Sequence, residues 1–114
     1  MISNLFDFDE LKLSDNFAIK HYKDAIYRGQ IKDKKRFGKG IIAYHSGRVY
    51  EGDWFADKRH GKGFEKFVNG NTYHGDYLEG KAFGKGLFTW EHGEVYDGEW
   101  VNGVKDGYGI WKGI

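Results

Sequence analysis

The sequence predicts an all-β protein built as one elongated, single antiparallel sheet of consecutive β-hairpins, with a short capping segment at the N-terminus. Three observations support this fold class. Of the 114 residues, 18 are Gly, while Pro and Cys are absent. Aromatic residues make up 18% of the chain and stand among the glycines, which is typical of many short strands joined by tight turns. The chain also repeats itself at an interval of 23 residues.

The repeat is easiest to follow in four tyrosines that stand 23 residues apart. Each is followed two positions later by Gly, and two positions after that by a large apolar residue. A pair of glycines separated by one residue begins eleven positions after each tyrosine, and an apolar residue follows the pair. Four copies in one register define an internal repeat. The tyrosines are Tyr27, Tyr50, Tyr73 and Tyr96, and the large apolar residues are Ile31, Trp54, Tyr77 and Trp100.

The chain begins with a segment outside the repeat. Residues 1–16 interleave Leu and Phe with Asp and Glu, and they form either a cap over the first hairpin or an arm that docks on a partner. We favour the cap, because an uncovered edge strand invites aggregation and terminal repeats need covering. Residues 17–26 match the second half of a repeat and are assigned to a half repeat, with a strand over residues 17–19.

Each full repeat is predicted to form one hairpin. Residues 50–54 alternate strictly, with Tyr, Gly and Trp on one face and two acids on the other, which indicates a strand. Residues 61–67 form the returning strand, and turns are expected at 55–60 and 68–72. The four repeats span residues 27–49, 50–72, 73–95 and 96–114.

The paired glycines explain how a single sheet can bury apolar area. A Gly within a strand leaves a slot, and a neighbouring aromatic ring can lie over that slot. One hairpin alone is marginal in stability, so the stack of hairpins is the folding unit. About nine strands spaced about 4.8 Å apart give a sheet about 40 Å long.

The pattern Tyr-x-Gly-x-Trp-x-x-Gly-Lys-x-x-Gly-x-Gly resembles the MORN repeat (membrane occupation and recognition nexus), and residues 73–86 match it best. The first copy departs from the pattern at Ile31 and Lys34, and the fourth at Val104. The resemblance implies a long, twisted array of hairpins. It also implies a binding role, because the catalysis of enzymes that contain MORN repeats belongs to a separate domain.

The residues that could carry chemistry are scattered. The five His occupy different columns of the repeat, and no pair has metal-ligand spacing. No Ser stands in a nucleophile elbow, and the Asp and Glu that recur with the repeat indicate a solvated face. We therefore expect a protein that is not an enzyme, with no catalytic residue, no metal site and no cofactor.

The first candidate binding surface is the row of aromatic rings. If part of this row is uncovered, it forms an apolar groove for a helix or an extended segment of a partner protein. The alternative is that all the rings are used in packing within the sheet. The row consists of Tyr27, Tyr50, Trp54, Tyr73, Tyr77, Tyr96 and Trp100.

The second candidate surface is basic. The net charge is −3 over residues 1–19, +7 over residues 20–66 and −3 over residues 67–114. Because the turns of stacked hairpins share one edge, the basic turn residues should gather there. They form a solvated edge, a site for acidic phospholipid headgroups, or a site for an acidic segment of a partner, including a charge-complementary end of another copy. These residues are Lys32, Lys34, Lys35, Arg36, Lys39, Lys58, Arg59 and Lys62.

The sequence thus favours a non-enzymatic scaffold for protein–protein interaction, and small MORN proteins suggest a structural subunit of a cytoskeletal or ciliary assembly. The alternatives are a peripheral binder of acidic phospholipids or phosphoinositides, and a detached regulatory MORN module of a lipid kinase. We expect no nucleic-acid partner, because most aromatic residues are committed to the glycine slots. Without a signal peptide or membrane span, the expected location is cytoplasmic, at the cytoskeleton or cilium, or peripheral at a membrane.

Overall fold

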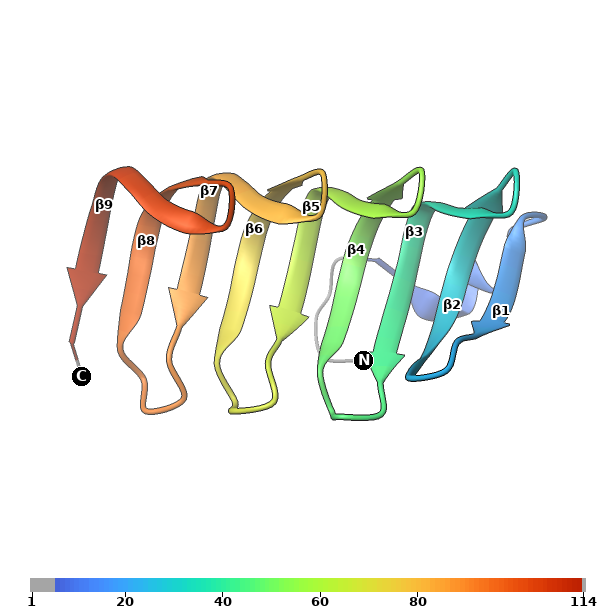
Figure 1. Ribbon diagram of the computed structural model, residues 1–114, viewed down its shortest axis with the longest axis horizontal. Helices are drawn as coiled ribbons and strands as arrows, with labels where there is room; N and C mark the ends of the chain where they lie inside the picture. The colour runs from blue at the N-terminus through green and yellow to red at the C-terminus, as the bar shows by residue number, and fades with distance from the viewer. Residues whose placement is uncertain (1–5, 114) are drawn as a thin grey trace.

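The computed structural model describes residues 6–113 and forms one open antiparallel sheet of nine strands, each paired with its neighbours in chain order (Figure 1). The predicted all-β fold and the hairpin array are confirmed. The extents of 43 × 26 × 24 Å agree with the expected length. A one-turn helix, α1 (Phe8–Leu11), precedes the sheet. The strands are β1 (Phe17–His21), β2 (Ala25–Lys32), β3 (Lys35–Tyr44), β4 (Val49–Phe55), β5 (Lys58–Lys66), β6 (Thr72–Leu78), β7 (Lys81–Thr89), β8 (Val95–Val101) and β9 (Val104–Lys112).

The hairpin turns within repeats are tighter than the sequence suggested. The turn predicted over residues 55–60 consists of Ala56 and Asp57 alone, with φ of 47° and 73°, and β5 already begins at Lys58. Two successive residues with positive φ match the twist of the flanking strands and leave no room for a longer loop. Residues 33–34, 79–80 and 102–103 form the equivalent turns, also with positive φ.

These four turns lie in a row along one side of the sheet, which we call the hairpin edge. Backbone hydrogen bonds connect consecutive turns. The Asp57 N–H donates to the carbonyl oxygen of Arg36, and the Gly80 N–H to that of Arg59, both at 2.9 Å. The Gly103 N–H donates in the same way to Ala82. The turns therefore stack as expected, and side chains at equivalent positions form straight columns.

The tyrosines of the repeat occupy the glycine slots, as predicted. We call the face that carries them the inner face and the opposite one the outer face. A Cβ atom added at Gly63 would lie 2.5 Å from Cε1 of Tyr50, closer than real Cβ contacts allow. The Tyr50 hydroxyl donates to the carbonyl oxygen of Asp53 at 2.8 Å, which fixes the ring over the slot. The same arrangement recurs for Tyr27 over Gly40, Tyr73 over Gly86 and Tyr96 over Gly109.

The large rings four positions later join neighbouring repeats. The Trp54 ring meets the rings of Tyr27 in the preceding repeat and Tyr50 in its own, edge to face, at centroid distances of 5.4 and 5.2 Å. Tyr77 and Trp100 make the equivalent contacts one and two repeats further on. Each edge-to-face pair adds about 0.5–1.5 kcal/mol beyond its buried area. The rings thus form one unbroken zigzag along the inner face.

The N-terminal segment packs on the outer face, where Figure 1 draws α1 behind the sheet. The Phe8 and Phe17 rings meet edge to face at 6.1 Å, and the Gln30 side chain donates to Oγ of Ser14 at 3.1 Å. Leu11 is buried. Whether this segment is a cap or a docking arm stays a prediction, and residues 1–5 of it lie outside the described residues.

We predict that Gly63→Ala destabilises the fold by about 1–3 kcal/mol, because the new methyl group displaces the Tyr50 ring from its slot. Gly63 does not have positive φ, so backbone strain does not contribute. Urea unfolding followed by circular dichroism measures the change. Gly113→Ala is the control, since a Cβ there meets no atom within 4 Å. Equal stability of the two variants would contradict the slot as the source of the core.

We also predict unfolding in alkali. Burial raises the pKa of Tyr27, Tyr50, Tyr73 and Tyr77 well above the ordinary value of about 10. The native state holds these protons more tightly than the unfolded chain does, so their contribution to stability is complete below about pH 10 and is lost as the pH rises further. Ultraviolet titration should show these four tyrosines ionising only together with loss of the circular dichroism signal. Reversible ionisation of all eight tyrosines near their ordinary pKa in a folded protein would refute this prediction.

Candidate functional site

The predicted aromatic row lies in the core. All seven rings are buried, and the most accessible of them, Trp100, is 6% exposed. Basic side chains from the hairpin edge cover them. The Arg36 guanidinium lies 4.5 Å from the Trp54 ring centroid, and Arg59 lies over Tyr50 and Tyr77. Burial therefore favours the packing interpretation for the row, and the surface open to a partner lies elsewhere.

The basic cluster divides into two sets. Four of its members form ion pairs with carboxylates of the same sheet. Arg36 pairs with Asp57, Lys39 with Asp53, Arg59 with Glu65 and Lys62 with Asp76. Within residues 6–113, no carboxylate lies within 4.0 Å of the other four, which we call the unpaired lysines: Lys32, Lys34, Lys35 and Lys58.

Arg36 holds two consecutive hairpin turns together. Its Nε atom donates to Oδ1 of Asp57 at 3.1 Å, and its Nη2 atom donates to the Asp57 carbonyl oxygen at 2.9 Å. Partial burial opposes ionisation of Asp57, but the Arg36 backbone N–H and guanidinium outweigh it and hold the pKa of that carboxyl below its usual range. Arg36 thus joins neighbouring repeats and is not available to an external anion.

Arg59 belongs to a buried polar network. Glu65 is 2% exposed, and both its carboxylate oxygens accept from Nη1 of Arg59 at 3.0 Å. The Tyr77 hydroxyl donates to Oε1 of Glu65 at 2.7 Å, and Arg48 pairs with the same carboxylate. Arg59 also donates to the carbonyl oxygen of Gly80 at 2.9 Å. A carboxylate that is neutralised and hydrogen-bonded on all sides stabilises the inner face and is unsuited to acid–base chemistry.

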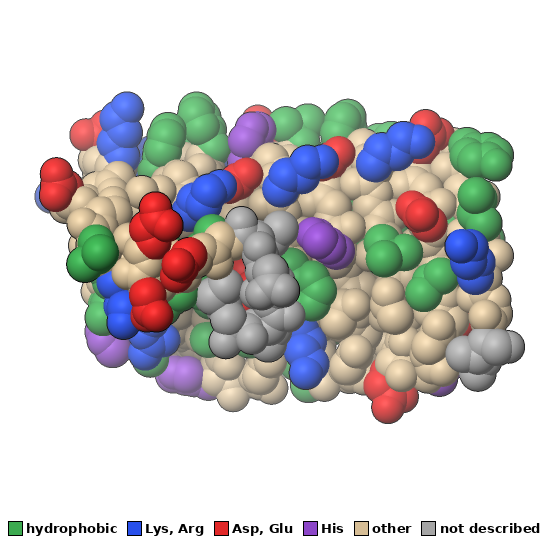
Figure 2. Space-filling model, turned by 180° about the vertical axis from the view of Figure 1, so that it is seen from behind, with side chains coloured by type: hydrophobic (Ala, Val, Ile, Leu, Met, Phe, Trp, Pro, Cys, Tyr) green, Lys and Arg blue, Asp and Glu red, His purple; other side chains and the backbone are tan. Residues whose placement is uncertain are grey.

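A ladder of ion pairs crosses the outer face below the hairpin edge, where Figure 2 shows basic and acidic side chains alternating in a row. Asp53, Asp76 and Glu99 each receive a Lys from the preceding repeat and a backbone N–H from their own returning strand. The Tyr108 N–H and then Lys85 hold the pKa of Glu99 below its usual range. The periodic carboxylates are therefore partners of the ladder.

The column of basic residues over the rings is interrupted in the third full repeat. Arg36, Arg59 and Lys105 stand in this column, and Ala82 takes the remaining place. A hollow of about 210 Å³ opens there on the inner face. Its polar lining includes Arg59 and Glu65, which already satisfy one another.

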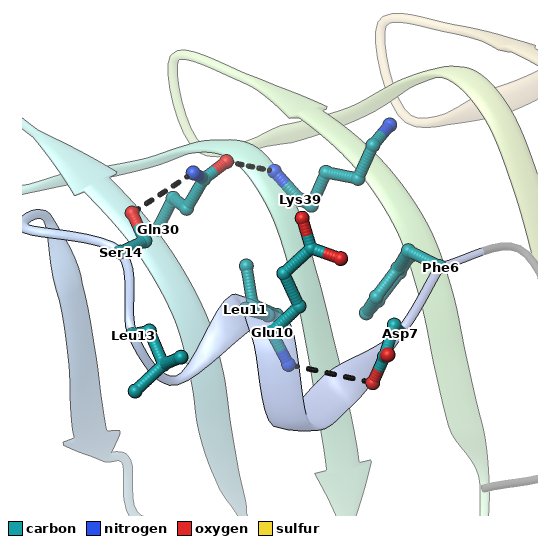
Figure 3. A pocket seen from close by; sticks show the side chains of 8 residues that line it. All are labelled: Phe6, Asp7, Glu10, Leu11, Leu13, Ser14, Gln30 and Lys39. Atoms are coloured by element: carbon teal, nitrogen blue, oxygen red, sulfur yellow. Dashed lines mark hydrogen bonds between the residues drawn. The ribbon is translucent and has the colours of Figure 1, made fainter.

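A larger hollow of about 610 Å³ lies between the N-terminal segment and the outer face (Figure 3). Gln30 crosses its rim, donating to Ser14 and accepting the Lys39 backbone N–H at 2.8 Å. The side chain of Gln30 therefore ties the N-terminal segment to β3. Its polar atoms are used within the chain, so this hollow presents no unsatisfied group from Gln30 to a ligand.

The exposed apolar side chains form the surface that sequence reasoning missed. Phe55, Leu78 and Val101 directly follow Trp54, Tyr77 and Trp100, so strand alternation places them on the outer face at the hairpin edge. Figure 2 shows hydrophobic side chains along this edge. Together with two neighbours they form what we call the apolar stripe. It consists of Phe55 (54% exposed), Leu78 (42%), Phe83 (39%), Val101 (37%) and Val104 (62%).

The apolar stripe borders two hollows. One, of about 270 Å³, lies between Phe55 and Leu78, and the other, of about 350 Å³, is lined by Phe83 and Val101. In the first repeat Lys32 takes the position of Phe55. This outer column of the hairpin edge thus begins with a basic residue, Lys32, and is apolar from Phe55 onward. The 23-residue spacing of Phe55, Leu78 and Val101 was the sequence signal for the stripe.

Within residues 6–113, no group of three or more His, Asp or Glu side chains is arranged to hold a metal ion. No helix in this range has the length and apolar character needed to cross a membrane.

We predict that Arg59→Ala lowers stability by about 2–4 kcal/mol, because it removes one of the two arginine partners of the buried Glu65 carboxylate. Lys58→Ala, at the neighbouring position, should change stability by less than about 0.5 kcal/mol. Thermal and urea unfolding of the two variants provide the measurement. If both variants were as stable as the wild type, Arg59 would not be needed for folding and would count as a candidate binding residue together with the unpaired lysines.

Comparison with sequence families finds the MORN repeat four times, at residues 27–47, 50–72, 73–94 and 96–113. Comparison with curated proteins gave no match. MORN repeats are non-catalytic modules known from protein–protein and membrane–lipid interactions. The four matches cover most of the chain and coincide with the four hairpins, so this chain belongs to the MORN-repeat family.

Proposed function

We propose that this chain is a non-enzymatic scaffold that binds an amphipathic helix of another protein along its hairpin edge. The observation that carries the proposal is the apolar stripe, in which five large side chains stay 37–62% exposed on a rigid and otherwise well-paired sheet. Contiguous exposed apolar side chains of this kind mark interaction surfaces. The ion-pair ladder and the stacked turns hold them in a straight line.

The spacing of the stripe favours a helix over an extended segment. Phe55, Leu78 and Val101 stand on alternate strands, about 9.6 Å apart. Residues seven apart on a helix rise about 10.5 Å and stay on one face. An extended segment covers that distance in about three residues, which places successive contacts on opposite faces. The proposed partner helix lies across the strands and carries apolar residues at about every seventh position.

The unpaired lysines define the charge of the partner. Lys58 pairs in register with Phe55 across the tight turn, and Lys34 and Lys35 lie at the preceding turn. A helix seated on the stripe reaches these lysines with one end. That end is therefore proposed to carry Asp or Glu, which sets the direction of the helix on the sheet.

More specifically, we propose that this chain is a structural subunit of a cytoskeletal or ciliary assembly. This proposal rests on the resemblance to small MORN proteins and on a surface shaped for holding a partner. If this is right, the tagged wild type sediments with the detergent-insoluble cytoskeleton, and Leu78→Lys shifts it to the soluble fraction. Equal distribution of the two proteins would count against this assignment.

The alternative is peripheral binding to acidic phospholipids or phosphoinositides. The unpaired lysines favour it, since each basic residue near an anionic surface contributes about 1 kcal/mol. The exposed Phe55 beside Lys58 adds an apolar contact for the headgroup region. A regulatory MORN module of a lipid kinase would use the same surface.

We predict that a synthetic helical peptide with Leu at every seventh position and Glu in its last turn binds the wild type, measured by fluorescence anisotropy. Leu78→Lys should weaken binding by about tenfold or more, because it places a charge in the centre of the stripe. The matched control is Leu87→Lys, which alters a 38% exposed leucine outside the stripe. Equal affinity of the two variants would refute the stripe as the binding site.

Vesicles separate the two functions. Vesicles of phosphatidylcholine with phosphatidylserine should not sediment the protein at physiological salt if the lead proposal holds. Sedimentation that disappears in the variant Lys34→Glu, Lys35→Glu, Lys58→Glu would favour the phospholipid alternative. The peptide measurement on the same variant then shows whether both ligands use one surface.

A further inference from the structure

The inner face departs from the repeat at Ala82. Arg36 and Arg59 stand at the equivalent positions of the first two repeats, and Lys105 stands at that of the fourth. Each of these three cations lies over rings of the aromatic row. The methyl group of Ala82 does not cover the rings in this way, and the hollow of about 210 Å³ opens beside it. The side chain that the third repeat lacks is therefore a cation.

The ring that receives such a cation is present in the third repeat. Trp54 and Trp100 hold equivalent places, and each indole Nε1 donates to a slot-glycine carbonyl oxygen of the preceding strand, at 3.1 and 3.0 Å. The Arg36 guanidinium lies 4.5 Å from the Trp54 ring centroid. Trp100 instead lines the hollow and is the most accessible ring of the row. Lys105 approaches Trp100 from β9, across β8 from Ala82, and does not line the hollow.

The acceptor for such a cation is present as well. Arg36 donates from Nη2 to the carbonyl oxygen of Asp57 in the next turn, and Arg59 donates likewise to that of Gly80, both at 2.9 Å. Gly103 holds the equivalent place in the following turn and lines the hollow. Among the described residues, no side chain donates to the Gly103 carbonyl oxygen. The hollow thus keeps the ring and the acceptor that two guanidinium groups of this chain use.

We propose that the hollow at Ala82 binds the side chain of an arginine supplied by a partner protein. Its guanidinium lies over the Trp100 ring and donates to the Gly103 carbonyl oxygen, while its methylene groups pack against Phe67 and Phe88, which line the hollow and are partly buried. Arginine fits better than lysine, because a planar group stacks on a ring and donates sideways at the same time. The site lies on the inner face, so it is independent of the apolar stripe and of the proposed function.

The charges around the hollow permit an added cation. The lining contains three basic residues, Arg48, Arg59 and Lys81, and one acid, Glu65, with which both arginines pair. A guanidinium at the Ala82 position stands one repeat from Arg59, about 9.6 Å away at two strand spacings. Arg36 and Arg59 already coexist at the same separation of one repeat. This distance exceeds the Debye length of about 8 Å at physiological salt, so the repulsion is largely screened.

The rings hold a cation in this column without a carboxylate. Among the described residues, no carboxylate lies within 4.0 Å of the Lys105 ammonium group. Its Nζ atom nevertheless lies 5.2–5.8 Å from four ring centroids, those of Trp90, Tyr96, Trp100 and Trp111. In the third repeat Phe88 takes the position of Glu65, which adds a ring in place of a carboxylate.

A chemical-shift titration tests the site on the 114-residue chain. The probes are N-acetyl-arginine amide and its uncharged isostere, N-acetyl-citrulline amide. The arginine probe should shift the Trp100 Nε1–H signal saturably, with a Kd of about 1 mM, and the citrulline probe should bind about fivefold more weakly. Trp54 is the internal control, because Arg36 already covers its ring. Equal shifts of the two indoles, equal affinity of the two probes, or no saturable shift would overturn the proposal.

The variant Ala82→Arg supplies the missing side chain from within the chain. It should abolish binding of the arginine probe and raise the melting temperature by about 2–4 °C. Ala82→Met is the matched control, because it fills the hollow without a charge and should raise the melting temperature less. Probe binding that persists in Ala82→Arg, or a melting temperature of Ala82→Met equal to or above that of Ala82→Arg, would contradict a cation site.

A peptide separates a partner's arginine from a free guanidino compound. A peptide with one arginine between apolar residues should bind at least about tenfold more tightly than the arginine amide, because its flanking residues reach Phe67 and Phe88. The same peptide with citrulline at that position should lose this affinity. If the arginine peptide bound no better than the amide, the site would take a small guanidino compound, and the assignment to a protein partner would be wrong.

Discussion

A tyrosine ring lying over two bare glycines is the contact on which the rest of this sheet depends. A single sheet has no second layer to cover its apolar side chains, so it must provide its own core. The glycine slots bring the rings down to the level of the backbone, where the hydroxyl of Tyr50 reaches a carbonyl oxygen of its own strand. The large ring four positions later then fits between two such tyrosines and joins the repeats.

The position of the rings determines what the charged residues do. Rings in one row offer a continuous π surface, and guanidinium groups at the hairpin edge lie against it. Arg36 and Arg59 are held there by ion pairs and by carbonyl oxygens of neighbouring turns. Half of the basic cluster thus belongs to the structure of the sheet. The unpaired lysines do not reach the carboxylate ladder, and the Nζ atom of Lys32 lies instead over the Phe37 ring, outside the row.

Periodicity predicted the strands, their order and the role of the glycines, because each of these repeats every 23 residues and depends on near neighbours. It left open whether the ring row is buried or forms a groove for a partner. That burial depends on side chains such as Arg59, which come from the far end of a hairpin after the strand has shifted register between Gly52 and Trp54. The apolar stripe was also not predicted, because Phe55 was assigned to the turn at residues 55–60, whereas it is the last residue of β4 and lies on the outer face. The length of the tight turns was overestimated because Ala56 and Asp57 lack the Asn-Gly signal for a two-residue turn, which among the four tight turns only that of the fourth repeat carries, at Asn102 and Gly103.

Columns that keep their residue type and columns that change it have different physical roles. The tyrosine and slot-glycine columns are the same in all four hairpins, because the sheet closes its core in only one way. The outer column at the hairpin edge runs from Lys32 through Phe55 and Leu78 to Val101, and no contact of the core depends on it. Such a column is free to differ from turn to turn without cost to the fold. A sheet of this kind can therefore acquire a binding surface, basic at one end and apolar along the rest, while its framework stays unchanged.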